Sequence, residues 1–194
     1  LGHARLALTT AEPNLVEGRE LIRPQSVAVD GAGGFIYVAD TFNNRVLGWR
    51  NAFSFENGAA ADLVIGQRDR MTTIALGPGS GFNSGLTAPT GVALDAQGNL
   101  FVADAGNSRI VRYARPFAQP DEIKLSDLVV GQPNSQSRGS NTGGLSERSL
   151  ASLLGGGVLR MSIVFDAQGN LWVTDSGNHR ILRYPASALG EGAS

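Results

Sequence analysis

Residues 86–113 read LTAPTGVALDAQGNLFVADAGNSRIVRY, and the same pattern is written twice more along the chain. Residues 159–184 read LRMSIVFDAQGNLWVTDSGNHRILRY, and residues 21–50 carry a looser copy, LIRPQSVAVDGAGGFIYVADTFNNRVLGWR. The acidic residues at equivalent places in the three copies are Asp30, Asp95 and Asp166. The interval between them accommodates one four-stranded unit and a long loop, so the chain is a repeat protein.

The composition is that of a globular protein. With 42% hydrophobic residues in 194, the chain can bury a core, and its 26 glycines suit a protein made of many tight turns. The net charge is -1, so no cationic field exists to hold a phosphate backbone, and nucleic-acid binding is disfavoured. The absence of cysteine excludes disulfides, thiolate zinc sites and thiol catalysis. No apolar run approaches the roughly 18 residues of a membrane span.

The first two copies each predict a unit of four short antiparallel strands, and the third copy predicts the first three of them. In the second copy an alternating segment is followed by Ala96-Gln97-Gly98-Asn99, where Gly98 offers the positive φ that a short hairpin requires. The strands predicted in this copy are 91–95, 100–104, 109–113 and 127–132, and the last is matched in the first copy by 62–67. The inner strands are predicted at 26–30, 91–95 and 162–166, burying Val27, Val29, Val92, Leu94, Ile163 and Phe165. Helical turns are expected only within 146–154 and 185–189.

Glycine-rich turns joining four-stranded units, none of which can bury both faces alone, are typical of β-propeller blades. The segments PTGVALD (89–95), LFVAD (100–104) and GNSRI (106–110) resemble the NHL repeat family, which folds as β-propellers. The blade repeats run approximately over 21–67, 86–132 and 159–184. The DLVIGQ and DLVVGQ strands are similar to the bacterial, exported branch of that family. This resemblance implies a secreted, periplasmic or cell-surface location, with any export signal preceding Leu1.

Three blades form half of a six-bladed ring. The third copy has no counterpart of DLVIGQ, whereas Ala4-Arg5-Leu6-Ala7-Leu8 aligns with Ala61-Asp62-Leu63-Val64-Ile65. We therefore expect residues 1–194 to form a single propeller segment with an outer strand at 4–8. Two chains joined head to tail would then close a six-bladed homodimer, and the alternative is a longer chain with further blades.

Alternation of strand direction places the largest loops on one side of the predicted disc. Connections from second to third strands emerge on the same side as those from each fourth strand to the next blade. The first kind comprises 41–44, 105–108 and 176–179, and the second kind comprises the inserts 68–88 and 133–158. Loops on a rigid scaffold commonly carry binding, so we expect the binding surface on this side.

Two sets of residues stand out in these loops. One set recurs in every blade, and we interpret it as structural, with Asp and Asn bonding turn amides while Arg pairs with a carboxylate. Its members are Asp40, Asn43 and Arg45, then Asp104, Asn107 and Arg109, then Asp175, Asn178 and Arg180. The other set differs between copies and supplies the ligand-binding candidates Phe42, Asn44, Met71, Phe82, Ser108 and His179. The competing interpretation is that the large apolar members of this second set pack beneath their own loops.

No catalytic residue, metal or cofactor is predicted. His3 and His179 are the only histidines and lack metal-ligand spacing, and one carboxylate per hairpin falls short of the roughly 6 to 8 oxygens that calcium takes. No serine lies in a G-x-S-x-G context, and Gly155-Gly156-Gly157 lacks the Lys-Ser/Thr of a phosphate loop. We therefore expect a noncatalytic scaffold that binds a protein, peptide or glycan. The alternative is part of a metal-dependent lyase or hydrolase, lactonase-like or amidating-lyase-like, completed by missing blades.

Overall fold

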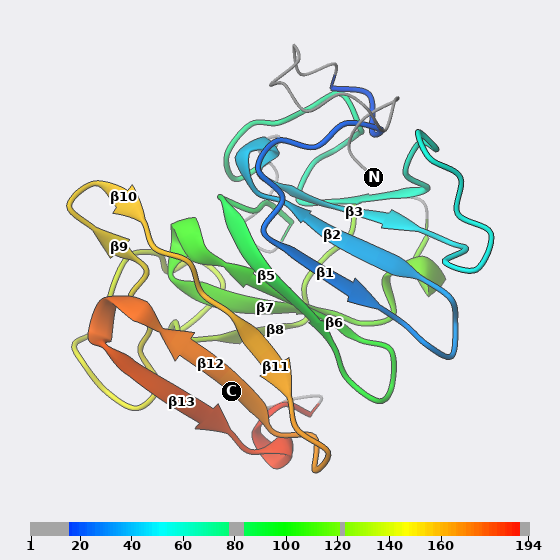
Figure 1. Ribbon diagram of the computed structural model, residues 1–194. Helices are drawn as coiled ribbons and strands as arrows, with labels where there is room; N and C mark the ends of the chain where they lie inside the picture. The colour runs from blue at the N-terminus through cyan, green and yellow to red at the C-terminus, as the bar shows by residue number, and fades with distance from the viewer. Residues whose placement is uncertain (1–15, 78–83, 121–122, 191–194) are drawn as a thin grey trace.

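The computed structural model describes residues 16–77, 84–120 and 123–190, so the expected strand at 4–8 lies outside the described residues. Three antiparallel sheets stand side by side, and their first strands β1, β5 and β11 are neighbours (Figure 1). Blade 1 contains β1 (Ser26–Val29), β2 (Ile36–Asp40), β3 (Arg45–Trp49) and β4 (Leu63–Ile65). Blade 2 contains β5 (Pro89–Leu94), β6 (Leu100–Asp104), β7 (Arg109–Tyr113) and β8 (Leu128–Val130). Blade 3 contains β11 (Ile163–Phe165), β12 (Leu171–Asp175) and β13 (Arg180–Tyr184).

The fold is the all-β propeller that the repeats predict. Strands pair in chain order within each blade, and β5 pairs with β6 in the register Val92 to Val102 and Leu94 to Leu100. The hairpin between them is closed by Asp95, whose Oδ1 accepts the backbone N–H groups of Gln97 and Asn99 at 2.9 Å each. Asp166 repeats this turn in blade 3. The repeated aspartates are therefore the residues that close the inner hairpins.

Two apolar cores hold the blades together. Every blade has two faces. The face turned toward the preceding blade in chain order is called here the leading face, and the face turned toward the next blade is called the trailing face. Between blades 1 and 2, the trailing side chains of Tyr37, Ala39 and Val46 meet the leading side chains of Val92 and Val102. Between blades 2 and 3, the trailing side chains are Phe101, Ala103, Ile110, Leu128 and Val130, and the leading ones are Ile163, Leu171 and Val173. Each interface therefore joins a trailing face to the next leading face.

The predicted burial of the inner strands holds in blades 2 and 3 but not in blade 1. Val92 and Ile163 are buried in the two cores, and Leu94 and Phe165 are partly buried and pack against them. Val27 and Val29, in contrast, are 59% and 57% exposed. The prediction of their burial was wrong because they lie on the leading face of blade 1, which has no preceding blade among the described residues.

Short helical turns occur where the repeats place the second-to-third strand connection. They span η1 (Thr41–Asn43), η2 (Ala105–Asn107) and η4 (Ser176–Asn178), and none of them was predicted. A further turn, η3 (Pro116–Ala118), was also missed, whereas η5 (Ala186–Ala188) lies in the expected segment. The segment 146–154 is not helical, since it forms turns and then enters the two-stranded hairpin of β9 (Leu153–Leu154) and β10 (Gly157–Val158). Gly155 and Gly156 have positive φ and supply the turn of that hairpin.

Truncation of Phe101 to alanine tests the packing between blades 2 and 3. The ring is 1% exposed and stacks edge-on against Phe165 at a centroid distance of 4.9 Å. We expect Phe101→Ala to lower the free energy of unfolding by about 3 to 5 kcal/mol through lost burial and the cavity left behind. Urea denaturation measures this change. Phe53→Ala is the matched control, because Phe53 is 81% exposed and its truncation should change stability by less than about 0.5 kcal/mol.

Candidate functional site

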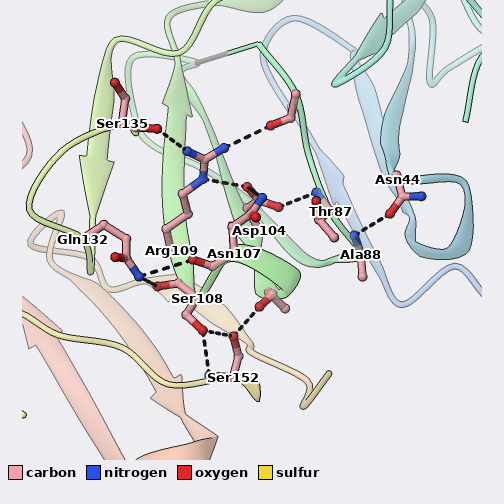
Figure 2. A network of polar contacts seen from close by, with 12 residues as sticks. Asn44, Thr87, Ala88, Asp104, Asn107, Ser108, Arg109, Gln132, Ser135 and Ser152 are labelled. Atoms are coloured by element: carbon pink, nitrogen blue, oxygen red, sulfur yellow. Dashed lines mark hydrogen bonds and ion pairs between the residues drawn. The ribbon is translucent and has the colours of Figure 1, made fainter. Parts of the chain in front are cut away.

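The recurrent Asp and Arg form an ion pair in each blade, and the recurrent Asn donates a hydrogen bond to the same aspartate. In blade 2, Arg109 Nε and Asn107 Nδ2 both donate to Asp104 Oδ2 at 2.7 Å, and the backbone N–H of Thr87 donates to Asp104 Oδ1 at 2.7 Å. The remaining guanidinium nitrogens of Arg109 donate to the carbonyls of Ser135 and Gly85 (Figure 2). One carboxylate and one guanidinium thus connect two strands to the loops before and after the blade.

The same arrangement occurs in the other two blades. Arg45 Nε lies 2.7 Å from Asp40 Oδ2, and the Arg45 guanidinium reaches the carbonyls of Arg70 and Glu20. Arg180 Nε lies 2.7 Å from Asp175 Oδ2. The loop contacts in blade 3 run from the Arg180 guanidinium to the carbonyls of Ser146 and Ser149, and from the Ala151 N–H to Asp175.

The hydrogen-bond partners predicted for the aspartates and asparagines differ from those observed. The amides that the aspartates accept belong to the loop that enters the blade, at Ile22, Thr87 and Ala151, and not to the turn that follows the strand. The asparagines donate to the aspartates. The motif therefore ties distant loops to the sheet instead of stabilising a local turn.

Burial sets the electrostatics of these pairs. The side chains of Asp104 and Arg109 are fully buried, as are those of Asp40 and Arg45. Burial raises the pKa of the Asp104 carboxyl above its ordinary value, and the Arg109 charge and the donated hydrogen bonds oppose that rise. A buried charge that lost its partner would be left without compensation, so neither member of the pair is available to a ligand.

A second buried network, which includes two glutamines missed from the sequence, fixes the loops to the blades. Gln132 Nε2 donates to the carbonyls of Ser108 at 2.9 Å and Gly139 at 2.8 Å, and Gln67 Nε2 donates to those of Asn44 and Ile74. The signal for these residues was the shared ending of DLVIGQ and DLVVGQ, in which each glutamine follows a glycine with φ near 90°. The Oε1 atoms of both glutamines are buried and have no hydrogen-bond partner among the described residues.

Two of the six ligand-binding candidates lie within this network. Ser108 is fully buried, and its hydroxyl lies 3.0 Å from that of Ser152, which donates to the Ala105 carbonyl (Figure 2). Asn44 Nδ2 donates to the Thr73 carbonyl and its Oδ1 accepts the Ala88 N–H. Both residues are thus engaged in holding loops, where the sequence had placed them on the binding surface.

The other candidates that the structure describes are exposed. Phe42 is 54% exposed and Met71 70% exposed, so neither packs beneath its own loop, and His179 is exposed as well. The guanidinium of Arg23 lies over the Phe42 ring, 4.8 Å from its centroid. Phe82 lies outside the described residues.

Apolar side chains gather on the loops of this side, which is called here the insert-loop face. The exposed members are Phe42, Met71, Ile74, Leu145, Leu153, Leu154 and Val158. Leu153, Leu154 and Val158 lie on the β9–β10 hairpin, which projects from blade 3 (Figure 1). This hairpin was not predicted from the sequence, because two-residue strands around a glycine pair carry too little periodicity to be recognised. The alternation of Leu153-Leu154 and Gly157-Val158 around Gly155-Gly156 was the only available signal.

Two clefts open on the opposite side, near the inner hairpins. One of about 660 Å³ lies between blades 2 and 3 and is lined by residues that include Asp95, Phe101, Arg112, Arg115 and Phe165. A smaller one of about 210 Å³ lies between blades 1 and 2, beside Phe35 and Phe117. Arg112 is not free to bind there, since its guanidinium pairs with Asp127 and reaches the Leu189 carbonyl.

The described residues contain no group of three or more His, Cys, Asp or Glu side chains placed to hold a metal ion. The carboxylates of the inner hairpins are occupied by their turns, and hydrogen bonds from Trp172 Nε1 and Asn170 lower the pKa of Asp166 to about 2. Over the same described ranges, no helix has the length and apolar character needed to cross a bilayer.

Substitution of Arg109 tests the assignment of the motif to structure. Arg109→Ala leaves the Asp104 carboxylate buried without its cation, so we expect a loss of about 3 to 5 kcal/mol in the free energy of unfolding. Arg180→Ala is the matched variant in blade 3, where the arginine side chain is 27% exposed. Water can compensate Asp175 there, so the loss should be only about 1 to 3 kcal/mol. Equal losses in the two variants, measured by chemical denaturation, would contradict the role given to burial.

Comparison with known proteins agrees with the geometry of the blades. The family model of the NHL repeat matches residues 21–49, 86–113 and 162–184. The chain is 38% identical over 88 residues to NHL repeat-containing protein 2 of Bos taurus and 36% identical over 88 residues to that of Homo sapiens. Each match covers 44% of this chain and 12% of the relative. The matched segment is therefore a small part of those proteins.

Solved structures match the chain at low sequence identity and low TM-score. An auxiliary nutrient binding protein from Bacteroides thetaiotaomicron is 13% identical with a TM-score of 0.46, over 81% of this chain and 36% of that one. Hydrazine synthase of Kuenenia stuttgartiensis is 10% identical with a TM-score of 0.44, over 90% of this chain and 37% of that one. Both TM-scores are below 0.5, so the fold assignment depends on the repeats and the sheets themselves.

Proposed function

Because the chain belongs to the NHL-repeat family, we propose that it is a noncatalytic propeller scaffold that binds a protein, peptide or glycan through the insert-loop face. The observation that carries this proposal is the combination of exposed apolar side chains with loops held by buried polar contacts. Met71 and Leu154 are 70% and 61% exposed, although the loops that carry them are fixed by Arg45, Gln67 and Ser152. Rigid loops that present apolar groups bind with a low entropic cost.

Phe42 occupies a position where the other two blades have glycine, and this difference supports a binding role. In blades 2 and 3 the same position is Gly106 and Gly177, where a Cβ atom would approach Thr87 Cγ2 to 2.4 Å and the Ala151 carbonyl oxygen to 2.6 Å. In blade 1, the Phe42 N–H still donates to Ile22, at 3.2 Å compared with 2.8 Å for the glycines. Blade 1 thus accommodates an aromatic side chain at a crowded place and leaves it in solvent, where aromatic residues commonly anchor partners.

The β9–β10 hairpin adds a second apolar element to this surface. Leu154 and Val158 are 61% and 42% exposed, although a two-stranded ribbon of this size gains nothing from presenting them to water. The hairpin is anchored at its base, where Ser140 Oγ accepts the Leu153 N–H and Ser108 Oγ accepts the Ser152 N–H. A ligand that contacts the hairpin would therefore meet a surface already in place.

Peptide and glycan arrays probed with the purified chain test the proposal. We expect binders whose affinity falls at least tenfold with Phe42→Ser or Leu154→Ser, because each removes an exposed apolar contact without touching the core. Phe53→Ser is the matched control, since this ring is 81% exposed in the β3–β4 connection on the opposite side. Binders that respond to Phe53→Ser and not to the loop variants would contradict the assignment of the face.

The noncatalytic part of the proposal has a separate test. In the alternative, the chain is part of a metal-dependent lyase or hydrolase whose ligands come from further blades. Stoichiometric zinc or calcium in the purified full-length protein, lost together with an activity on chelation, would establish that alternative. We propose a location outside the cytoplasm as well, which fractionation of the source cells tests.

We also propose that two chains join head to tail. Within the chain, each trailing face packs on the next leading face. The leading face of blade 1 exposes Val27 and Val29, and the trailing face of blade 3 exposes Val164, Trp172 and Ile181 at 61%, 39% and 67%. These two open faces are complementary in kind, so contact between them in a pair of chains would continue the internal packing with closed two-fold symmetry.

Sedimentation of the 194-residue chain tests this assembly. We expect a dimer that dissociates with Val27→Glu or Val164→Glu, because either substitution places a charge in the proposed apolar contact. Leu145→Glu is the control, since Leu145 is 67% exposed on the insert-loop face and lies in neither open face. A wild-type monomer at concentrations in the range of tens of micromolar would rule out the dimer without bearing on loop binding.

A further inference from the structure

The connections that follow the third strands differ among the blades in their aromatic residues. In blade 2 this connection contains η3, which carries Phe117, whereas η5, which follows the third strand of blade 3, contains only alanine and serine. The Phe117 ring packs on two aromatic rings of blade 1, with centroid distances of 4.5 Å to Phe35 and 5.6 Å to Tyr37. The repeat itself does not account for this group of three rings, because the other described interface between blades lacks a counterpart of Phe117.

The three rings line the smaller of the two clefts, which has a volume of about 210 Å³ and is called here the aromatic slot. Gln97 and Arg115 line both the aromatic slot and the larger cleft of about 660 Å³ between blades 2 and 3. The two hollows therefore adjoin at these residues. Together they fall within the size range of small-molecule sites, roughly 300 to 1,000 Å³.

Tyr37, which lines the aromatic slot, has a hydroxyl without a hydrogen-bond partner. The residue is 1% exposed, and within the ranges that the structure describes its hydroxyl makes no hydrogen bond. Burial and the nearby Asp30 charge raise the pKa of this hydroxyl above its ordinary value, so it is a donor at neutral pH. An unsatisfied buried hydroxyl costs free energy, which an acceptor atom of a ligand would recover.

Arg115 places a positive charge at the same slot. Its side chain is exposed, and its guanidinium has no ion-pair or hydrogen-bond partner in the described part of the chain. A second arginine, Arg50, lies over the Phe117 ring at 4.8 Å from the centroid. The carboxylate in the slot lining is that of Asp30, which accepts the Ala32 N–H at 2.9 Å. Two arginine charges thus face one carboxylate, so the slot favours an anion.

We propose that the aromatic slot and the adjoining Arg115 bind a small aromatic carboxylic acid. The ligand ring occupies the slot against Phe35 and Phe117, and its carboxylate accepts hydrogen bonds from the Arg115 guanidinium and the Tyr37 hydroxyl. Apolar walls with a few placed polar groups are the usual composition of small-molecule sites. Charge-assisted hydrogen bonds are stronger than neutral ones, so the site prefers a carboxylate to a neutral amide of the same shape.

Three small probes test this proposal on the intact chain. They are 2-naphthoate, which has both the ring and the charge, 2-naphthamide, which has the ring alone, and acetate, which has the charge alone. Isothermal titration calorimetry measures each affinity. We expect saturable binding of one 2-naphthoate per chain, binding of 2-naphthamide at least about tenfold weaker, and no saturation by acetate over the same concentration range.

Removal of the two donors tests the contacts with the carboxylate. Arg115→Gln should weaken 2-naphthoate about tenfold and leave 2-naphthamide unchanged, so that the preference for the acid disappears. Arg68→Gln is the matched control, since the Arg68 side chain is 67% exposed in the loop after blade 1. Tyr37→Phe keeps the ring and should weaken 2-naphthoate about three- to tenfold. Tyr184→Phe is its control, because the Tyr184 hydroxyl is also buried without a described partner but lies in blade 3.

Filling the aromatic slot tests where the ring binds. Ala118 is exposed and lines the slot, so Ala118→Phe should abolish binding of both naphthalene probes by occupying their space. Ser187→Phe is the matched control, because Ser187 is an exposed residue of η5 and lines neither cleft. If Ala118→Phe fails to fold, Arg115→Gln and Tyr37→Phe still decide the outcome, since each removes polar atoms without adding volume.

Three results would overturn the proposal. The first is no saturable binding of 2-naphthoate, and the second is equal affinity of the unmodified chain for the acid and the amide. The third is an unchanged preference for the acid in Arg115→Gln, which would place the bound 2-naphthoate elsewhere on the chain. The aromatic slot shares no residue with the insert-loop face, so its failure leaves the proposed binding by that face intact.

Discussion

The ion pair between the aspartate at the end of each second strand and the arginine that opens the third is the interaction on which the loops of this protein depend. Its carboxylate accepts an amide from the preceding loop, and its guanidinium bonds carbonyls of loops from both sides, as Asp104 and Arg109 do for Thr87, Gly85 and Ser135. Such a pair gains little net energy, because desolvation of the two charges offsets most of their attraction. The ion pair instead fixes the position of loop segments that have no regular secondary structure of their own.

The second constraint is that every blade has two apolar faces. A sheet in a sandwich can present one face to water, whereas the sheet of blade 2 packs one face on blade 1 and the other on blade 3. The constraint is satisfied twice within the described residues, at the two cores, and it remains unsatisfied at Val27 on one end and at Trp172 and Ile181 on the other. The two ends therefore expose apolar side chains of the kind that the interfaces between blades bury.

Much of this fold could be predicted from the sequence, because the repeats report on local chemistry. The turn at Asp95 and Gly98, the strand alternation and the recurrence of Asp104 and Arg109 are all readable from the sequence. The exposure of Val27 could not be read from the sequence, because the equivalent residue Val92 is buried by the preceding blade and a described preceding blade is absent for Val27. Ser108 was likewise misplaced because its contact, Ser152, lies 44 residues away and no periodicity links the two. Local rules thus predicted the blade, whereas contacts between blades required the structure.

The same distinction explains where specificity can arise in this chain. Positions bound by the repeat, such as Asp104, Asn107 and Arg109, are fully buried or nearly so and offer no atom to a partner. Exposed positions fall into two classes. One comprises loop residues that differ between the copies, such as Phe42, and the other comprises edge residues such as Arg183. Arg183 belongs to the second class only because blade 3 lacks a described outer strand, since its counterpart Arg112 is buried and paired with Asp127. The burial of a repeat position therefore depends on the neighbours that surround it in each blade and not on the residue type alone.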